Sequence, residues 1–73
     1  MTVARVSEIS VLSRTSFEDA IKEGIERATQ TLRNVQAAWV KEQRVVVENG
    51  QISGWEVHLL VTFVLDEGSS AGS

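Results

Sequence analysis

The 73-residue sequence predicts one α+β domain with the element order β-α-β-β, in which a three-stranded antiparallel sheet wraps a single helix. Three observations lead to this prediction. Residues 16–34 repeat apolar side chains at helical spacing, three other stretches are rich in β-branched residues, and an Asn-Gly pair separates the last two stretches. We expect residues 1–66 to form the domain and the Gly- and Ser-rich residues 67–73 to form a disordered tail.

The first strand is predicted at residues 3–12, which read VARVSEISVL. The stretch is rich in β-branched side chains and alternates enough between apolar and polar residues for a strand. Alternation with a period of two indicates a strand that buries one of its faces.

The helix is predicted at residues 16–34, SFEDAIKEGIERATQTLRN. Ser13 and Ser16 are both candidate N-caps, and the sequence does not choose between them. Arg33 is expected in the last turn, where the helix dipole favours a cation. Gly24 lies within the apolar stripe, so we expect the helix to approach the sheet closely at this point. The stripe consists of Phe17, Ala20, Ile21, Gly24, Ile25, Ala28 and Leu32.

The second and third strands are predicted at residues 35–48 and 51–65, and the Asn-Gly pair between them indicates a hairpin turn. In the third strand the odd positions are apolar, so we expect them to pack under the helix while the even positions face away. The second face is expected to carry Ala37, Trp39, Lys41 and Gln43 together with Glu56 and His58.

This second face of the sheet predicts an oligomer, because one helix covers only one face. A lone exposed Trp39 would waste a side chain able to bury roughly 200 Å². A chain of this length has a thin margin of buried surface, and it has no cysteine from which to form a disulfide. We therefore expect other copies of the chain to cover the second face.

Composition excludes several classes of function. The net charge of −3 and the dispersed basic residues argue against nucleic acid as a partner. No apolar run has the length of a membrane span and the first residues do not resemble a signal peptide, so we expect a cytoplasmic protein. Without a cysteine nucleophile or a Gly-rich phosphate loop, and with His58 as the only histidine, we do not expect an enzyme.

Several segments together resemble the dodecin family over about residues 3–66. They are the helix SFEDAIKEGIERATQTLRNV, the strand that follows it, the turn ENGQI and the closing V-x-F-x-L pattern. The resemblance implies a β-α-β-β subunit, twelve copies of which form a hollow shell. It also implies binding of riboflavin or FMN for storage, without enzymatic turnover.

The same resemblance implies which residues would contact a flavin, and two of them depart from the typical pattern. The stacking tryptophan, three residues after Asn34, corresponds to Ala37, and the glutamine that binds the edge of the ring corresponds to Glu56. An ionised carboxylate lacks the N–H donors of an amide. Trp39 points to the same face as Ala37, roughly 7 Å further along the strand. It could stack on a ligand, occupy the place of the ligand, or be buried between subunits.

Other polar residues leave alternatives open. Lys41, Gln43 and Arg44 could contact the phosphate of a nucleotide, or they could be solvated or form ion pairs between subunits. Glu56 and His58 could share a metal ion or join subunits by a hydrogen bond. Calcium is a further possibility because carboxylate oxygens are its preferred ligands; the candidates are Glu8, Glu42, Glu48 and Asp66.

Two functional hypotheses follow. In the first, the oligomer binds or stores a flavin-type ligand, with Trp39, Ala37, Glu56, Gln43 and Arg44 as the candidate binding residues. In the second, it is a structural or calcium-binding shell without flavin, in which Trp39 packs the interface between subunits.

Overall fold

A computed structural model of the chain describes residues 3–65. It contains β1 (Ala4–Ser13), α1 (Phe17–Thr31), β2 (Val35–Glu48) and β3 (Gln51–Val64). The predicted order β-α-β-β is therefore confirmed. The domain boundary at residue 66 and the predicted disorder of residues 67–73 lie outside the described residues.

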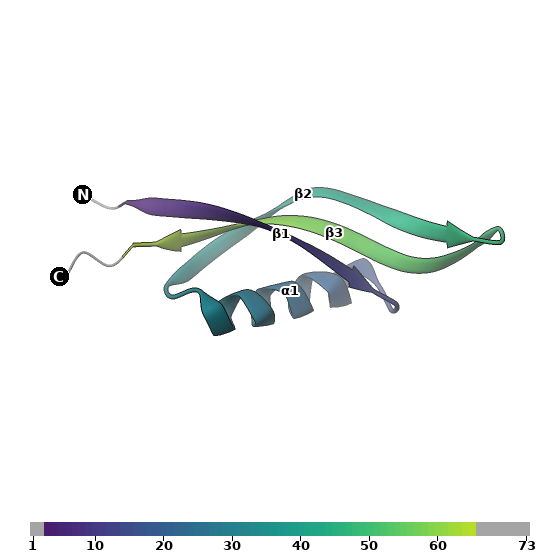
Figure 1. Cartoon of the computed structure of the whole chain (residues 1–73), viewed down its shortest axis with the longest axis horizontal. Helices are drawn as coiled ribbons and strands as arrows, with labels where there is room; N and C mark the ends of the chain where they lie inside the picture. Colours follow the sequence, from purple (N-terminus) through teal and green to yellow (C-terminus); the bar gives the residue numbers. More distant parts are fainter. Residues whose placement is uncertain (1–2, 66–73) are drawn as a thin grey trace.

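The three strands form one antiparallel sheet in the order β1-β3-β2, so β3 is the central strand. The helix α1 lies under one face of this sheet, and the β2–β3 hairpin projects beyond the helix (Figure 1). The molecule is elongated, with a longest dimension of 54 Å. In the part of the chain that the structure describes, no helix combines the length and apolarity that a membrane span requires.

The core lies between α1 and the odd-numbered residues of β3, as the alternation predicted. Val57, Leu59 and Val61 are fully buried and contact Ala20 and Ala28 of the helix stripe. β1 adds Ile9 and Val11, which stand opposite Leu59 and Val57 in the sheet register and therefore share their face. The partly buried residues around this core are Ile9, Val11, Phe17, Ile21, Ile25, Leu32, Val35 and Ala38.

The start of α1 resolves the choice between the two serines. Ser16 is the N-cap, and its hydroxyl accepts a hydrogen bond from the Asp19 amide at 3.0 Å. The buried Ser13 stabilises the loop that precedes the helix. Its hydroxyl accepts from the Thr15 amide at 2.9 Å and donates to the Asp19 carboxylate at 2.8 Å.

The helix ends earlier than predicted, at Thr31, so the placement of Arg33 in its last turn was wrong. Leu32 is already extended, and Asn34 adopts the left-handed conformation with φ of 61°. The Asn34 side chain donates to the Val64 carbonyl at 3.3 Å, and the Val64 amide donates to the Asn34 carbonyl at 3.1 Å. These two hydrogen bonds to the end of β3 therefore stabilise the turn that leads from α1 into β2.

The predicted hairpin turn is confirmed at Asn49 and Gly50, whose φ angles are 53° and 76°. Positive φ at both central residues defines the type I′ turn, whose twist matches that of the flanking strands. This geometry explains the Asn-Gly pair at the tip of the hairpin.

Gly24→Ala is expected to destabilise the protein. A Cβ at this position would lie 2.8 Å from Val11 Cγ2 and 2.9 Å from Leu59 Cδ1. Overpacking of this kind costs about 1–3 kcal/mol and outweighs the helix propensity of alanine, because the β-branched Val11 is stiff and Leu59 is fully buried. Urea unfolding should show a lower free energy of unfolding, whereas Gln30→Ala, at an exposed position of α1, should change it little. A Gly24→Ala variant as stable as the wild type would contradict the close helix–sheet approach.

Ser16→Ala is expected to lower the free energy of unfolding by about 1 kcal/mol, because the Asp19 amide loses its partner at the start of α1. Thr15→Ala provides the matched control, since Thr15 is exposed and contributes its backbone amide to the bond with Ser13. Thermal unfolding at one protein concentration would compare the two variants. Equal losses would show that Ser16 is not the N-cap.

Candidate functional site

A β-bulge in β2 decides which side chains reach the sheet face turned away from α1. Val40 pairs with Leu59, and the next paired residue is Glu42, opposite His58, so Lys41 is the extra residue. One extra residue reverses the alternation of faces beyond it. Glu42 and Arg44 therefore join the face of His58 and Glu56, whereas Gln43 stands opposite the buried Val57. The prediction that Gln43 shares the far face was wrong for this reason.

We call the sheet surface turned away from α1 the open face. Its members are identified by their register with the even-numbered residues of β3, because directly paired residues lie on the same side of a sheet. They are Val6, Glu8, Ser10 and Leu12 of β1, Ala37, Trp39, Glu42 and Arg44 of β2, and Glu56, His58, Leu60 and Thr62 of β3. The bulge residue Lys41 has no partner in the register, and its contact with Glu8 adds it to this face.

The apolar part of the open face is left uncovered in the single chain. Trp39 is 67% exposed, Leu12 57% and Val6 53%. Trp39 stands opposite Leu60, in the middle of the face, as the sequence predicted. An exposed indole with apolar neighbours is typical of a surface that another molecule covers.

The polar part of the open face is a connected set of ion pairs that crosses all three strands. Lys41 Nζ donates to Glu8 Oε2 at 3.3 Å, which joins β2 to β1. Arg44 Nε donates to Glu56 Oε1, and the Ser10 hydroxyl donates to the other oxygen of the same carboxylate at 3.2 Å. Glu56 is therefore held from both neighbouring strands, and its side chain is only 19% exposed.

His58 lies at the centre of this set. Its Nδ1 is 3.9 Å from Glu8 Oε2 and 3.8 Å from Glu42 Oε1, and its Nε2 is 4.0 Å from Glu56 Oε2. Each of the three carboxylates comes from a different strand. The imidazole is thus surrounded by groups that accept hydrogen bonds.

The environment of Glu56 keeps this residue ionised. The hydrogen bond from Arg44 lowers the pKa of the Glu56 carboxyl below its usual value; partial desolvation opposes this shift, and the Ser10 hydroxyl adds to it. At neutral pH the side chain is a fixed anion that only accepts hydrogen bonds.

A hollow of about 450 Å³ opens in the open face, a volume in the range of small-molecule sites. The structure brings Glu56, Arg44 and Gln43 together there, and the two other lining residues are Glu42 and His58. Trp39 lies beside the hollow, because its partner Leu60 is two residues from His58, roughly 7 Å along β3. Ala37 is one step further away, opposite Thr62, and does not line the hollow.

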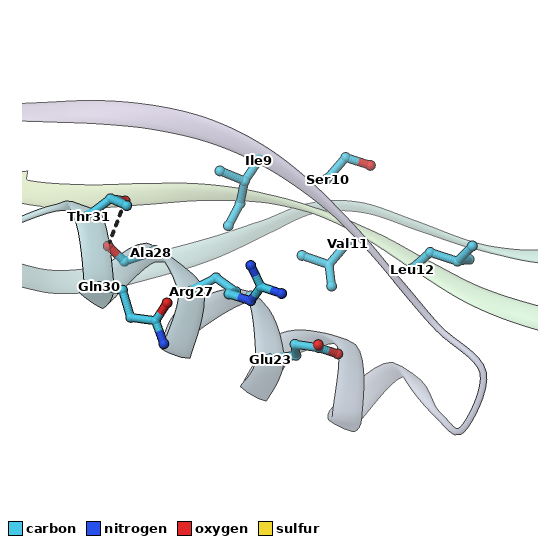
Figure 2. A pocket seen from close by; sticks show the side chains of 10 residues that line it. Ile9, Ser10, Val11, Leu12, Glu23, Arg27, Ala28, Gln30 and Thr31 are labelled. Carbon is cyan, nitrogen blue, oxygen red and sulfur yellow. Dashed lines mark hydrogen bonds between the residues drawn. The ribbon is translucent and has the colours of Figure 1, made fainter.

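A second hollow of about 450 Å³ lies on the other side of the sheet, between β1 and α1. Figure 2 shows Ile9 and Val11 pointing from β1 toward the helix, whereas Ser10 and Leu12 point away from it. Glu23, Arg27 and Gln30 form the polar part of its lining. None of the predicted site residues lines this groove, so it is separate from the candidate site.

Metal binding gains no support from the geometry. Within residues 3–65, no group of three or more histidine, aspartate or glutamate side chains is placed to hold a metal ion. Glu48 lies at the far end of β2, away from Glu8 and Glu42, and Asp66 lies outside the described residues. The calcium hypothesis therefore has no preformed site in the single chain.

Sequence reasoning missed the part that Ser10 plays in fixing Glu56, and it placed Glu8 only among scattered carboxylates. The alternation of β1 carried the signal, since Glu8 and Ser10 are two residues apart and so share a face. Their distance from Glu56 depended on the order of the strands, which places β3 between β1 and β2.

Comparison with known proteins gives a consistent result. The dodecin family model matches residues 3–66. Among solved structures, the dodecin from Streptomyces davaonensis is 41% identical, with a TM-score of 0.85 over 90% of this chain and 97% of that chain. The dodecin from Streptomyces coelicolor is 33% identical, with a TM-score of 0.85 over 90% and 94% of the two chains.

A variant of the dodecin from Thermus thermophilus is 31% identical, also with a TM-score of 0.85, over 92% of this chain and 98% of that chain. A comparison with curated proteins gave no match. Dodecins are small, non-enzymatic binding proteins that store flavins, and they are homo-oligomers. From its fold and from these matches, this chain belongs to the dodecin family.

Proposed function

We propose that the chain assembles into a closed dodecamer that stores a flat ligand of the flavin type, riboflavin or FMN, against its open face. The observation that carries this proposal is the placement of Trp39. Its indole is 67% exposed beside a hollow of about 450 Å³, on the sheet face that α1 leaves uncovered. A flat ring between such indoles would bury apolar surface on both of its sides.

The residues around Trp39 suit different parts of such a ligand. Ala37 is small and exposed, so it leaves room on the same face for a ring that extends along β2. Arg44 lines the hollow and could contact a polar tail, with the guanidinium suited to a phosphate; Gln43 borders the hollow, but by register it stands on the other side of the sheet. Glu56 would accept a hydrogen bond from the edge of the ring.

Assembly is supported by the apolar side chains of the open face. Trp39, Leu12 and Val6 are each more than half exposed, which is unfavourable for a small domain that remains alone in water. Family membership supports a homo-oligomer, and the number twelve and the closed shell are part of the proposal. The cytoplasmic location predicted from the sequence stays a prediction.

The alternative is a shell that binds no flavin, in which a neighbouring copy covers Trp39. Two observations favour it. The position expected for a stacking tryptophan is Ala37, and the donor Nε of Arg44 is already bonded to Glu56 within the hollow. Binding measurements decide between the two candidates.

Riboflavin is expected to lose most of its fluorescence on addition of the protein, because stacking on an indole quenches the ring. Saturation should occur at a fixed ratio of ligand to subunits. Trp39→Ala should weaken binding by about tenfold or more, and Trp39→Phe, which keeps an aromatic ring, by less. Emission that stays unchanged at micromolar protein would reject flavin storage and favour the alternative.

Trp39→Ala is also expected to weaken assembly more than it weakens folding of the subunit, because the indole is exposed in the single chain and lies outside the core. Sedimentation velocity at low micromolar concentration should show smaller species, with an unchanged far-ultraviolet circular dichroism spectrum. Lys22→Ala, at an exposed position of α1, should sediment as the wild type does. A Trp39→Ala variant that stays fully assembled on dilution would count against a packing role for the indole.

A further inference from the structure

The hollow of the open face offers more hydrogen-bond acceptors than free donors, and this excess restricts the ligands that it can bind. This inference rests on the proposed function, since it concerns the same site and ranks the flat aromatic ligands that the site would take, with neutral flavin rings below cations. It depends on three properties: the fixed ionisation of Glu56, the balance of charge around it, and the position of Trp39.

Glu56 is a rigid acceptor. Arg44 and Ser10 hold its two oxygens from the two neighbouring strands, and the side chain is 19% exposed. Ionised and fixed in this way, it offers lone pairs and no proton. A ligand carbonyl oxygen placed against it would meet repulsion between two acceptors.

The remaining groups add negative charge. Glu8, Glu42 and Glu56 carry three negative charges, and Lys41 and Arg44 carry two positive ones, so the carboxylates outnumber the permanent cations by one. Both cations are already paired, Lys41 with Glu8 and Arg44 with Glu56. Among residues 3–65, Glu42 forms no ion pair with a lysine or arginine, and the side chain beside it is His58, whose Nδ1 lies 3.8 Å from Glu42 Oε1. The carboxylate of Glu42 is 71% exposed and lines the hollow, so it is accessible to a ligand.

Trp39 favours the same type of ligand. The face of an indole carries partial negative charge and attracts cations more strongly than the other aromatic side chains do. Trp39 lies on the open face, and its partner Leu60 is two residues along β3 from His58, which lines the hollow. A flat cation could therefore stack on the indole while its donors reach Glu42 and Glu56.

We infer that the hollow selects flat aromatic ligands that present positive charge and N–H donors, the class of protonated aromatic amines, and that Glu56 is the residue that sets this preference. A neutral ring with carbonyl groups along its edge would bind more weakly, because it offers acceptors to a site that already has an excess of them.

Two tricyclic probes of similar size test the inference. Proflavine is a cation with two amino groups, and lumiflavin is a neutral flavin ring with two carbonyl groups, a single N–H between them and no ribityl chain. Equilibrium dialysis at neutral pH and physiological salt gives the affinity of each probe. We expect the wild type to bind proflavine about tenfold more tightly than lumiflavin, the scale of one charge-assisted hydrogen bond.

Glu56→Gln should reduce this preference about tenfold, since the amide supplies N–H donors to the carbonyl groups of lumiflavin. Glu48→Gln is the matched control, because it removes the same charge at the hairpin end of β2, outside the hollow. It should leave the ratio of the two affinities unchanged. Should Glu56→Gln fail to assemble by sedimentation, Glu42→Gln takes its place and should also weaken proflavine binding.

The outcomes separate this inference from the proposed function. Wild-type protein that binds lumiflavin as tightly as proflavine, or a ratio that Glu56→Gln and Glu48→Gln shift equally, overturns the inference and leaves ligand storage intact. Binding of neither probe by the wild type overturns ligand storage, and this inference with it.

Discussion

The structure depends on one constraint, which is that a single short helix covers a single face of a three-stranded sheet. The buried side chains of Val57, Leu59 and Val61 all lie on the α1 side of the central strand. A Cβ at Gly24 would lie within 3 Å of Val11 and Leu59, and Ala28 is buried, so the layer between α1 and the sheet is tightly packed. The domain therefore has its core on one side of the sheet. The other side of the sheet is uncovered, and Trp39 is exposed in the middle of it.

The chemistry of the open face follows from the bulge at Lys41. A regular β2 would have placed Gln43 opposite the polar residues of β3 and turned Glu42 and Arg44 toward the helix side. With the bulge, Glu42 pairs with His58 and Arg44 with Glu56, and Lys41 donates to Glu8 across the central strand. One extra residue thus converts two rows of charges into a connected set with a hollow at its centre. Bulges commonly re-aim side chains in this way.

If an assembly buried the charged residues of the open face, the ion pairs and hydrogen bonds among them would contribute more to stability. Exposed ion pairs contribute little to stability, because water screens them. When neighbouring copies exclude water from the face, unpaired charges become costly and the existing bonds of Glu56 to Arg44 and Ser10 become favourable. The single chain already holds these groups in place, so a ligand or a partner subunit meets a preorganised surface.

The sequence by itself determined the elements, their order and the buried row of β3, because period and turn chemistry are local properties. The stripe of α1 from Phe17 to Ala28, the buried residues Val57, Leu59 and Val61 of β3 and the Asn49–Gly50 turn appear where the pattern predicts them. The candidate residue Glu56 was found through a family resemblance, Arg44 through the suitability of its side chain for a phosphate, and Trp39 through its place on the second face. Only the tertiary structure decided the early end of α1, which Asn34 and Val64 fix across the fold. It also decided the face of Gln43, the bond of Ser10 to Glu56 and the hollow between them, since these depend on a bulge and on a strand order that bring distant residues together.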